Sequence, residues 1–294
     1  MLELNSINRS FGDRRVLRDV SFTVGSGRMT GFVGGNGAGK TTTMRVILGV
    51  LSADSGTVTL NGSELTAERR TRFGYMPEER GLYPKMRVLE QLVYLGRLHG
   101  MTQEQATASA DSLLERLGLA ERKNDTVESL SLGNQQRAQI AAALVHDPEV
   151  LVLDEPFSGL DPIAVETVMS VLKDYTARGV PVLFSSHQLD IVERLCDDLV
   201  VIADGEIRAS GSREGLRTEH ARDRYELHTD GDAGWLRSEP GVTVVEFAGG
   251  YALFDVDDAE TAQRVLRQAT QKGAVLKFSP QHPTLSQIFQ EVIR

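Results

Sequence analysis

The stretch Gly34-Gly35-Asn36-Gly37-Ala38-Gly39-Lys40-Thr41 decides the fold of this 294-residue chain. It matches the pattern G-x-x-x-x-G-K-[ST], in which a glycine-rich loop turns backbone N–H groups toward an anion. The apolar run Met29–Val33 before it predicts a short buried strand, and Lys40 to Leu48 after it predicts a helix. A loop between a strand and the positive end of a helix is a cradle for phosphate groups.

The side chains that follow this loop predict a nucleotide and a metal. Lys40 is expected to reach the β- and γ-phosphates, Thr41 to bind Mg²⁺, and Thr42 to add a phosphate hydrogen bond. A glycine turn without a ligand is the alternative, and the strand and helix on either side disfavour it. The other expected nucleotide-binding residues of the loop are Asn36, Gly37, Ala38 and Gly39.

A second apolar strand, Val150–Leu153, ends in two carboxylates, Asp154 and Glu155. An acidic pair at a strand end is often a solvated turn. Combined with the glycine-rich loop, it predicts that Asp154 binds Mg²⁺ and that Glu155 orients or deprotonates the attacking water.

The rest of the chain predicts an α/β domain followed by a small α+β domain. Two alternating runs, Leu2–Ile7 and Val16–Val24, predict an antiparallel hairpin, and apolar spacing from Val88 to about Leu119 predicts an inserted helical segment. A boundary is expected near residue 215. The later elements are expected at Ile163–Ala177, Pro181–Phe184, Leu189–Leu195, Tyr225–Thr229, Val242–Phe247, Tyr251–Val256, Asp258–Lys272 and Val275–Phe278.

Composition excludes several functions. The net charge of −9 disfavours a protein that coats nucleic acid, and the single Cys196 excludes an internal disulfide and fits a reducing compartment. Apolar runs are far shorter than the roughly 20 residues that span a bilayer. The N-terminus lacks the features of a secretory signal, so we expect a cytoplasmic location.

Three further motifs give the chain a family resemblance. Leu130-Ser131-Leu132-Gly133-Asn134-Gln135-Gln136 resembles the signature motif of ABC ATPases, Ser158-Gly159-Leu160-Asp161 resembles their D-loop, and His187 resembles their switch histidine. Taken singly, each piece is more typical of a structural feature: a helix cap at Ser131, a tight turn at Gly159 and a half-exposed histidine at His187. Together, and in the family's order over residues 1 to about 215, they identify the chain as similar to an ABC-type ATPase.

The resemblance implies a fold, a cofactor and partners. It implies a P-loop NTPase domain at 1–215, with an antiparallel β subdomain and a helical subdomain at about 79–146, and an accessory domain at 216–294. It implies that ATP and Mg²⁺ bind between two copies of the chain, where Ser131, Gly133, Asn134 and Asp161 of one copy face the nucleotide of the other. Lys40, Glu155 and His187 are the catalytic residues implied.

Four positions depart from the family pattern, and a fifth carries little information. Gly35 stands where proline is more usual, Leu132 and Asn134 alter the signature, and Glu78 replaces the usual glutamine of the Q-loop. Glu78 is kept as a possible Mg²⁺ ligand, with a solvated surface glutamate as the alternative. Phe11 lies where the family stacks an aromatic ring on adenine, and a phenylalanine that only packs a turn is its alternative.

Two functions remain open from the sequence. The first is the ATPase subunit of a transporter, peripheral at the inner face of the membrane, which docks on permease subunits through Leu82, Tyr83 and Met86. The second is a soluble ABC-type ATPase that acts on nucleic acid or ribosomes, which the absence of a coiled-coil arm and of a basic tail disfavours. The C-terminal domain resembles the extension of export-type ATPases, with Pro283–Phe289 as its closing helix, so export is favoured.

Overall fold

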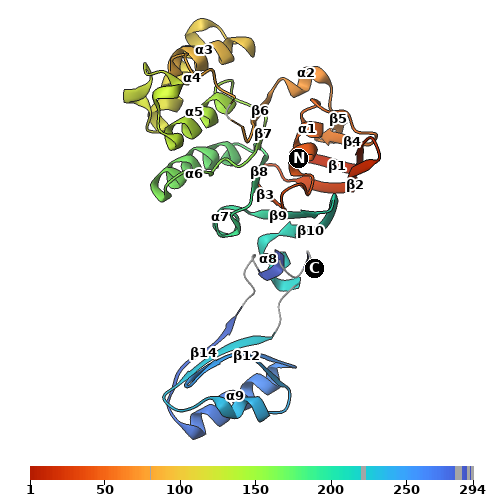
Figure 1. Cartoon of the computed structure of the whole chain (residues 1–294), viewed down its shortest axis with the longest axis vertical. Helices are drawn as coiled ribbons and strands as arrows, with labels where there is room; N and C mark the ends of the chain where they lie inside the picture. The colour runs from red at the N-terminus through yellow and green to blue at the C-terminus, as the bar shows by residue number, and fades with distance from the viewer. Residues whose placement is uncertain (80, 220–222, 282–286, 290–291, 293–294) are drawn as a thin grey trace. The chain divides into compact units, whose positions relative to one another are not determined.

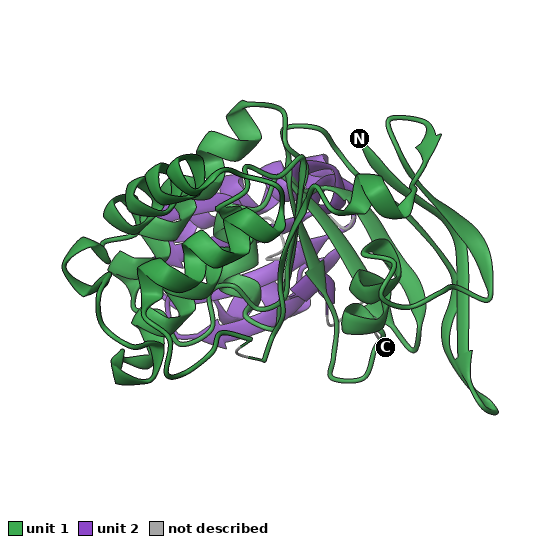
Figure 2. Ribbon diagram, turned by 90° about the horizontal axis from the view of Figure 1, so that it is seen from above, with its two compact units in different colours: residues 1–213, 293 green, residues 214–292, 294 purple. Residues whose placement is uncertain are grey.

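The computed structural model describes residues 1–79, 81–219, 223–281, 287–289 and 292. They form two compact units, coloured separately in Figure 2, which divide between Arg213 and Glu214. This division lies next to the boundary near residue 215 expected from the sequence.

A six-stranded sheet is the centre of unit 1 (Figure 1). In spatial order its strands are β10 (Glu206–Ser212), β9 (Asp198–Ala203), β3 (Met29–Val33), β8 (Val182–Ser186), β7 (Val150–Leu153) and β6 (Phe73–Met76). The strands from β9 to β6 are parallel, and β10 pairs antiparallel with β9 at the edge. Because β3, β7 and β8 are buried along their whole length, both faces of the sheet are covered.

The predicted hairpin is part of a second, antiparallel sheet. Its strands in spatial order are β2 (Arg14–Val24), β1 (Leu2–Phe11), β4 (Ser55–Leu60) and β5 (Ser63–Glu64). Both hairpin strands extend further toward the turn than the sequence suggests, because Phe11 pairs with Arg14 directly across it. Leu2, Leu4 and Ile7 of β1 are fully or almost fully buried in the core of unit 1.

The inserted helical segment is two helices rather than one continuous pattern. Gly100, with φ at +89°, ends the first, and Thr102 begins the second with a capping box to Gln105. The helices of unit 1 are α1 (Lys40–Ile47), α2 (Ala67–Arg70), α3 (Val88–Leu98), α4 (Gln103–Arg116), α5 (Leu132–Leu144), α6 (Pro162–Ala177) and α7 (Leu189–Leu195). In Figure 1, α3, α4 and α5 gather on one side of the six-stranded sheet, away from β1 and β2.

Unit 2 is a four-stranded antiparallel sheet with a helix on one face. In spatial order the strands are β12 (Val242–Ala248), β13 (Tyr251–Val256), β11 (Arg224–Thr229) and β14 (Val275–Gln281), and the helices are α8 (Arg213–Glu219) and α9 (Ala259–Lys272). Ala262, Val265 and Ala269 of α9 pack on Leu227 and Phe254 of the sheet. The predicted closing helix Pro283–Phe289 lies for the most part outside the described residues.

Cys196, directly after α7, is buried, and burial raises the pKa of its thiol to about 12. Among the described residues, no helix has the length and apolar character needed to cross a bilayer.

Candidate functional site

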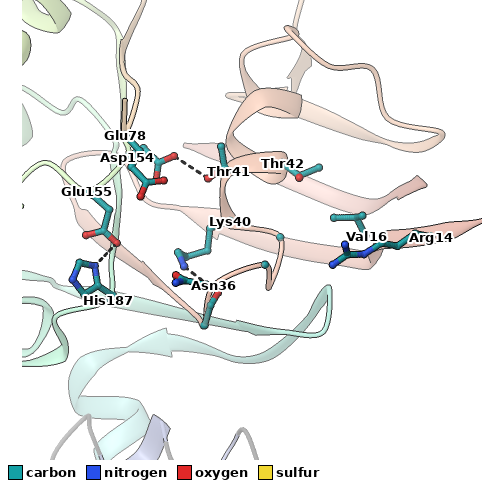
Figure 3. Close-up of a pocket in the computed structure, with 13 residues that line it drawn as sticks. Arg14, Val16, Asn36, Lys40, Thr41, Thr42, Glu78, Asp154, Glu155 and His187 are labelled. Atoms are coloured by element: carbon teal, nitrogen blue, oxygen red, sulfur yellow. Dashed lines mark hydrogen bonds and ion pairs between the residues drawn. The ribbon is translucent and has the colours of Figure 1, made fainter. Parts of the chain in front are cut away.

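A cavity of about 620 Å³ lies at the carboxyl ends of β3, β6, β7 and β8 (Figure 3). In a parallel sheet this edge is where ligands bind, because loops there connect strands to helix N-termini. The residues predicted from the sequence that line the cavity are Asn36, Gly37, Gly39, Lys40, Thr41, Thr42, Glu78, Asp154, Glu155 and His187.

The loop between β3 and α1 requires glycine at two positions. A Cβ atom on Gly34 would lie 2.4 Å from the carbonyl oxygen of Ile202, so the loop approaches β9 more closely than any side chain permits. Gly39 has φ at +114°, and its added Cβ would meet Leu17 at 2.8 Å. These glycines let the loop fold tightly at the N-terminus of α1, where free N–H groups and the helix dipole favour an anion.

Lys40 is folded back over this loop. Its Nζ donates hydrogen bonds to the carbonyl oxygens of Gly34 at 2.6 Å and Gly35 at 3.2 Å. No carboxylate neutralises the ammonium group in the described part of the chain, so its charge is available to an anion in the cavity.

Asp154 is held by hydroxyl groups. Its side chain is buried, Thr41 Oγ1 donates to Oδ2 at 3.0 Å, and Ser185 Oγ donates to Oδ1. Within the described residues no basic side chain pairs with it. A hydroxyl oxygen beside a carboxylate is the donor set that Mg²⁺ prefers, so these residues fit the expected metal.

Glu155 lies beside Asp154 in an unusual backbone conformation. Its φ is +52°, a left-handed value that costs energy for a residue other than glycine. The Glu155 N–H donates to Ser185 Oγ at 2.9 Å, and its carboxylate lies 2.9 Å from Nδ1 of His187. The backbone turn therefore brings the carboxylate to the cavity wall next to the histidine, as Figure 3 shows.

Sequence reasoning missed three residues of this site. Ser185 lies at the end of β8 and bonds both acidic residues, and only its place two residues before His187 could have indicated it. Arg14 and Val16 of β2 line the cavity on the side of the hairpin. Their alternation on one strand face was visible in the sequence.

Phe11 does not line the cavity. Its side chain is 49% exposed at the hairpin tip, and the Arg9 guanidinium covers one face of the ring at 5.0 Å. Ala38, also expected at the nucleotide, is buried in the core of unit 1 instead of lining the cavity.

The signature and D-loop residues also lie outside the cavity of their own chain. Ser131 caps α5, where its Oγ accepts from the Asn134 N–H at 3.4 Å, and Asp161 caps α6, where Oδ1 accepts from the Ala164 N–H at 2.8 Å. A Cβ on Gly133 would lie 3.4 Å from the carbonyl oxygen of Gly159, so the two segments are neighbours. Ser131 of the signature motif and Asp161 of the D-loop therefore cap helices in their own chain, whether or not they also contact a second copy.

A second cavity of about 360 Å³ is lined by residues of β6, α3 and α5 and by Leu82. Two of its residues, His99 and His146, have stacked rings with centroids 3.7 Å apart. His146 Nε2 lies 3.2 Å from the carbonyl oxygen of Phe73. Burial, and next the proximity of His99, lower the pKa of His146 to about 4, so its ring is neutral at pH 7.

Comparison with known proteins places both units. Residues 17–158 match the family described as ABC transporter, and residues 211–293 match the family described as the C-terminal domain of DrrA1-3-like ATP-binding proteins. The ABC transporter ATP-binding protein YhaQ of Bacillus subtilis is 36% identical over 293 residues, covering 100% of this chain and 98% of the relative.

The chain is also similar to an export protein and to a solved ATP-binding subunit. The Nod factor export ATP-binding protein I of Burkholderia lata is 36% identical over 275 residues, covering 92% of this chain and 90% of the relative. A solved ATP-binding subunit of an ABC transporter superposes with a TM-score of 0.69 and 31% identity, covering 74% of this chain and 92% of that one. Full-length similarity and the geometry of the cavity agree: the chain belongs to the ABC transporter ATP-binding proteins, a family that hydrolyses ATP to power transport.

Proposed function

We propose that this chain binds ATP with Mg²⁺ in the 620 Å³ cavity and hydrolyses it as a homodimer that drives a separate membrane permease. One observation carries the proposal: the glycine-rich loop before Lys40 and the acidic end of β7 line the same cavity. Phosphate-binding N–H groups and metal-binding oxygens are thus adjacent.

Each residue has a role that follows from its contacts. The loop N–H groups and Lys40 hold the phosphates, and Thr41 with Asp154 would hold Mg²⁺, which neutralises phosphate charge when bound. Glu155 accepts a proton from the attacking water, and His187 holds its carboxylate in place. Glu78 lines the same cavity, and its carboxylate would add an oxygen ligand for Mg²⁺.

The dimer follows from the residues left outside the cavity. Ser131, Gly133 and Asn134 stand at the N-terminus of α5, which favours an anion, but they do not line the cavity that contains the phosphate-binding loop of their own chain. A two-fold pair would bring this terminus, together with Asp161, to the nucleotide of the second copy.

Mixing two inactive variants tests the dimer. Lys40→Ala should lack its own phosphate site but keep the α5 terminus, and Ser131→Arg should have the opposite defect. In an equal mixture half the dimers are mixed, each with one complete site, so about a quarter of wild-type hydrolysis should return. An inactive mixture of two folded variants would contradict the shared site.

The metal is tested by phosphate release against Mg²⁺ concentration. Asp154→Asn should raise the Mg²⁺ requirement by about tenfold or more, since a carboxylate ligand becomes a neutral amide. The matched control is Asp174→Asn on the surface of α6, where the side chain is 64% exposed. Hydrolysis that survives complete chelation would refute the metal.

The permease is proposed to dock at the 360 Å³ cavity beside Leu82, and this would hold the chain at the cytoplasmic face of the membrane. Tyr83, with 61% of its side chain exposed, and the half-buried Met86 follow Leu82 in sequence. Export is the favoured direction, because the relatives include a Nod factor export protein and the C-terminal unit matches a DrrA1-3-like domain.

Docking is tested by co-purification with the membrane subunits encoded beside this chain. Leu82→Glu places a charge in the cavity and should abolish co-purification, whereas Leu98→Glu, at a position that is already 64% exposed, should not. If both variants co-purify with the membrane subunits equally well, the permease does not dock at this cavity.

A further inference from the structure

Two buried glutamines lie on the same side of α5, three residues apart in sequence. Gln136 and Gln139 are 7% and 3% exposed, values that are rare for a polar side chain without a fixed hydrogen-bond partner. Gln136 ends the signature segment and Gln139 lines the 360 Å³ cavity, but neither lines the nucleotide cavity.

Gln136 binds the backbone directly after β7. Its Nε2 donates to the carbonyl oxygens of Glu155 at 2.9 Å and Pro156 at 3.1 Å. An amide NH₂ group has two hydrogens, and both are used here.

Gln139 makes the equivalent contacts after the neighbouring strand β6. Its Nε2 donates to the carbonyl oxygens of Pro77 at 2.7 Å and Glu79 at 3.2 Å. These carbonyls flank Glu78, whose side chain lines the nucleotide cavity. One helix thus anchors the two acidic segments that leave adjacent strands.

The contact matters most at Glu155 because its backbone is strained. The left-handed φ of +52° persists only where surrounding groups hold it. The N–H of Glu155 is held by Ser185 from β8. Its carbonyl accepts from Gln136 of α5 at 2.9 Å and from the Ser158 N–H, three residues further along the chain, at 3.2 Å. Without Gln136 the carbonyl keeps only this local turn contact and loses its connection to α5, so the carboxylate can turn away from the cavity.

We infer, building on the proposed role of Glu155, that Gln136 and Gln139 are positioning residues that fix the two acidic strand ends at the cavity. Gln136 sets the position of the Glu155 carboxylate, and Gln139 sets that of Glu78. Because both glutamines belong to α5, a movement of this helix displaces both carboxylates together.

The principal test is Gln136→Met, which keeps the side-chain size but removes both N–H groups. The expected result is a fall in kcat of about 10- to 100-fold with the KM for ATP changed less than about twofold, because a displaced base slows chemistry without weakening phosphate binding. Binding of ATP and the melting temperature show that the variant is folded. If it does not fold, Gln136→His, which keeps one N–H, takes its place.

Gln139→Met is the matched variant, since it loses the same two hydrogen bonds one turn away. It should raise the Mg²⁺ concentration for half-maximal activity by about tenfold while kcat at saturating Mg²⁺ stays closer to wild type. Gln103→Met, at an exposed position of α4, should change neither quantity.

The inference requires that Gln136→Met mainly lowers kcat and that Gln139→Met mainly raises the Mg²⁺ requirement. Equal losses of kcat in both, in proportion to their losses of melting temperature, would reduce the glutamines to general stabilisers and overturn it. A normal kcat in folded Gln136→Met overturns the positioning of Glu155 alone if Glu155→Gln is inactive. Normal hydrolysis by Glu155→Gln instead overturns the proposed function on which the inference builds.

Discussion

Carboxylates at the cavity of unit 1 and on the sheet of unit 2 have different partners. Asp154 and Glu155 are bonded by hydroxyl groups and a histidine. On the face of the unit 2 sheet opposite α9, Glu226 lies 2.6 Å from Lys277 Nζ and 2.6 Å from His228 Nε2. Arg224 and Asp255 on the same face form a two-pronged ion pair.

The different partners indicate different roles: the carboxylates of unit 1 are available to a ligand, and those of unit 2 stabilise the sheet. A carboxylate that already has a cationic partner has little to gain from a cation in solution, so Glu226 and Asp255 stabilise their sheet. Carboxylates held only by hydroxyl groups and a histidine have oxygen lone pairs left over for a metal ion or a proton. Removing a charge should therefore cost turnover in the first region and stability in the second.

The largest expected effect is at Glu155. Glu155→Gln should lower ATP hydrolysis by about 10²- to 10⁴-fold, because the amide cannot accept a proton from water, while ATP affinity is kept. Phosphate release and ATP binding measure the two quantities, with the exposed Glu104→Gln as control. Turnover near the wild-type rate in Glu155→Gln would contradict the idea that the carboxylates of unit 1 serve catalysis and those of unit 2 serve stability.

The next effect is at the cation of the same cavity. Lys40→Ala should weaken ATP binding by about 10- to 100-fold, since one charge-assisted hydrogen-bonding group is lost. Isothermal titration with ATP measures it, and Lys173→Ala, at an exposed position of α6, is the matched control. An unchanged affinity would show that the free ammonium group does not serve an anion.

A smaller effect is the dependence of the stability of unit 1 on pH, which arises from the half-buried His146. The folded pKa of His146, about 4, lies below its ordinary 6.5, so the unfolded chain binds a proton first. Stability from this residue is therefore complete above pH 6.5 and is lost as the pH falls toward 4, by about 1–2 kcal/mol after allowance for partial exposure. Denaturant titrations of the wild type and of His146→Gln should diverge in this range. Parallel curves would contradict it.

The smallest effect is on the sheet of unit 2. Glu226→Gln should speed hydrogen exchange of β11 and β14 amides by an amount equal to about 0.5–1 kcal/mol and leave ATP hydrolysis unchanged. Lys277 and next His228 hold the pKa of Glu226 below its ordinary 4.5, so this stability is present at neutral pH and is lost as the pH falls below 4.5. A loss of turnover in this variant would show that the two regions are not separate.

The sequence predicted the elements that carry strong local patterns. The P-loop strand and helix, the hairpin and β7 were found because glycine spacing and continuous apolar runs are local signals. The strands β6 and β9 were not predicted, although both are buried in the sheet. β6 has four residues with a glycine among them, and its place depends on pairing with β7, a contact between distant segments.

The residues of the site were predictable where they belong to a sequence motif that indicates a particular ligand. Lys40, Thr41, Asp154 and Glu155 converge as expected, and their roles remain proposals. Ser185 and Gln136 could not be assigned, because a serine in a strand or a glutamine in a helix has no local signal for the backbone group it will meet. Phe11 shows the reverse case, because the resemblance to the family implied a contact with adenine and Phe11 does not line the cavity.

The burial of Cys196 has a practical consequence for experiments on motion. A thiol that is buried and stays protonated below about pH 12 reacts slowly with maleimides, so the native chain behaves as if it had no cysteine. A single cysteine introduced at an exposed position of α5 or of unit 2 can then carry a fluorophore or spin label without removing the natural residue. Distances within the proposed dimer thus become measurable in an otherwise unaltered protein.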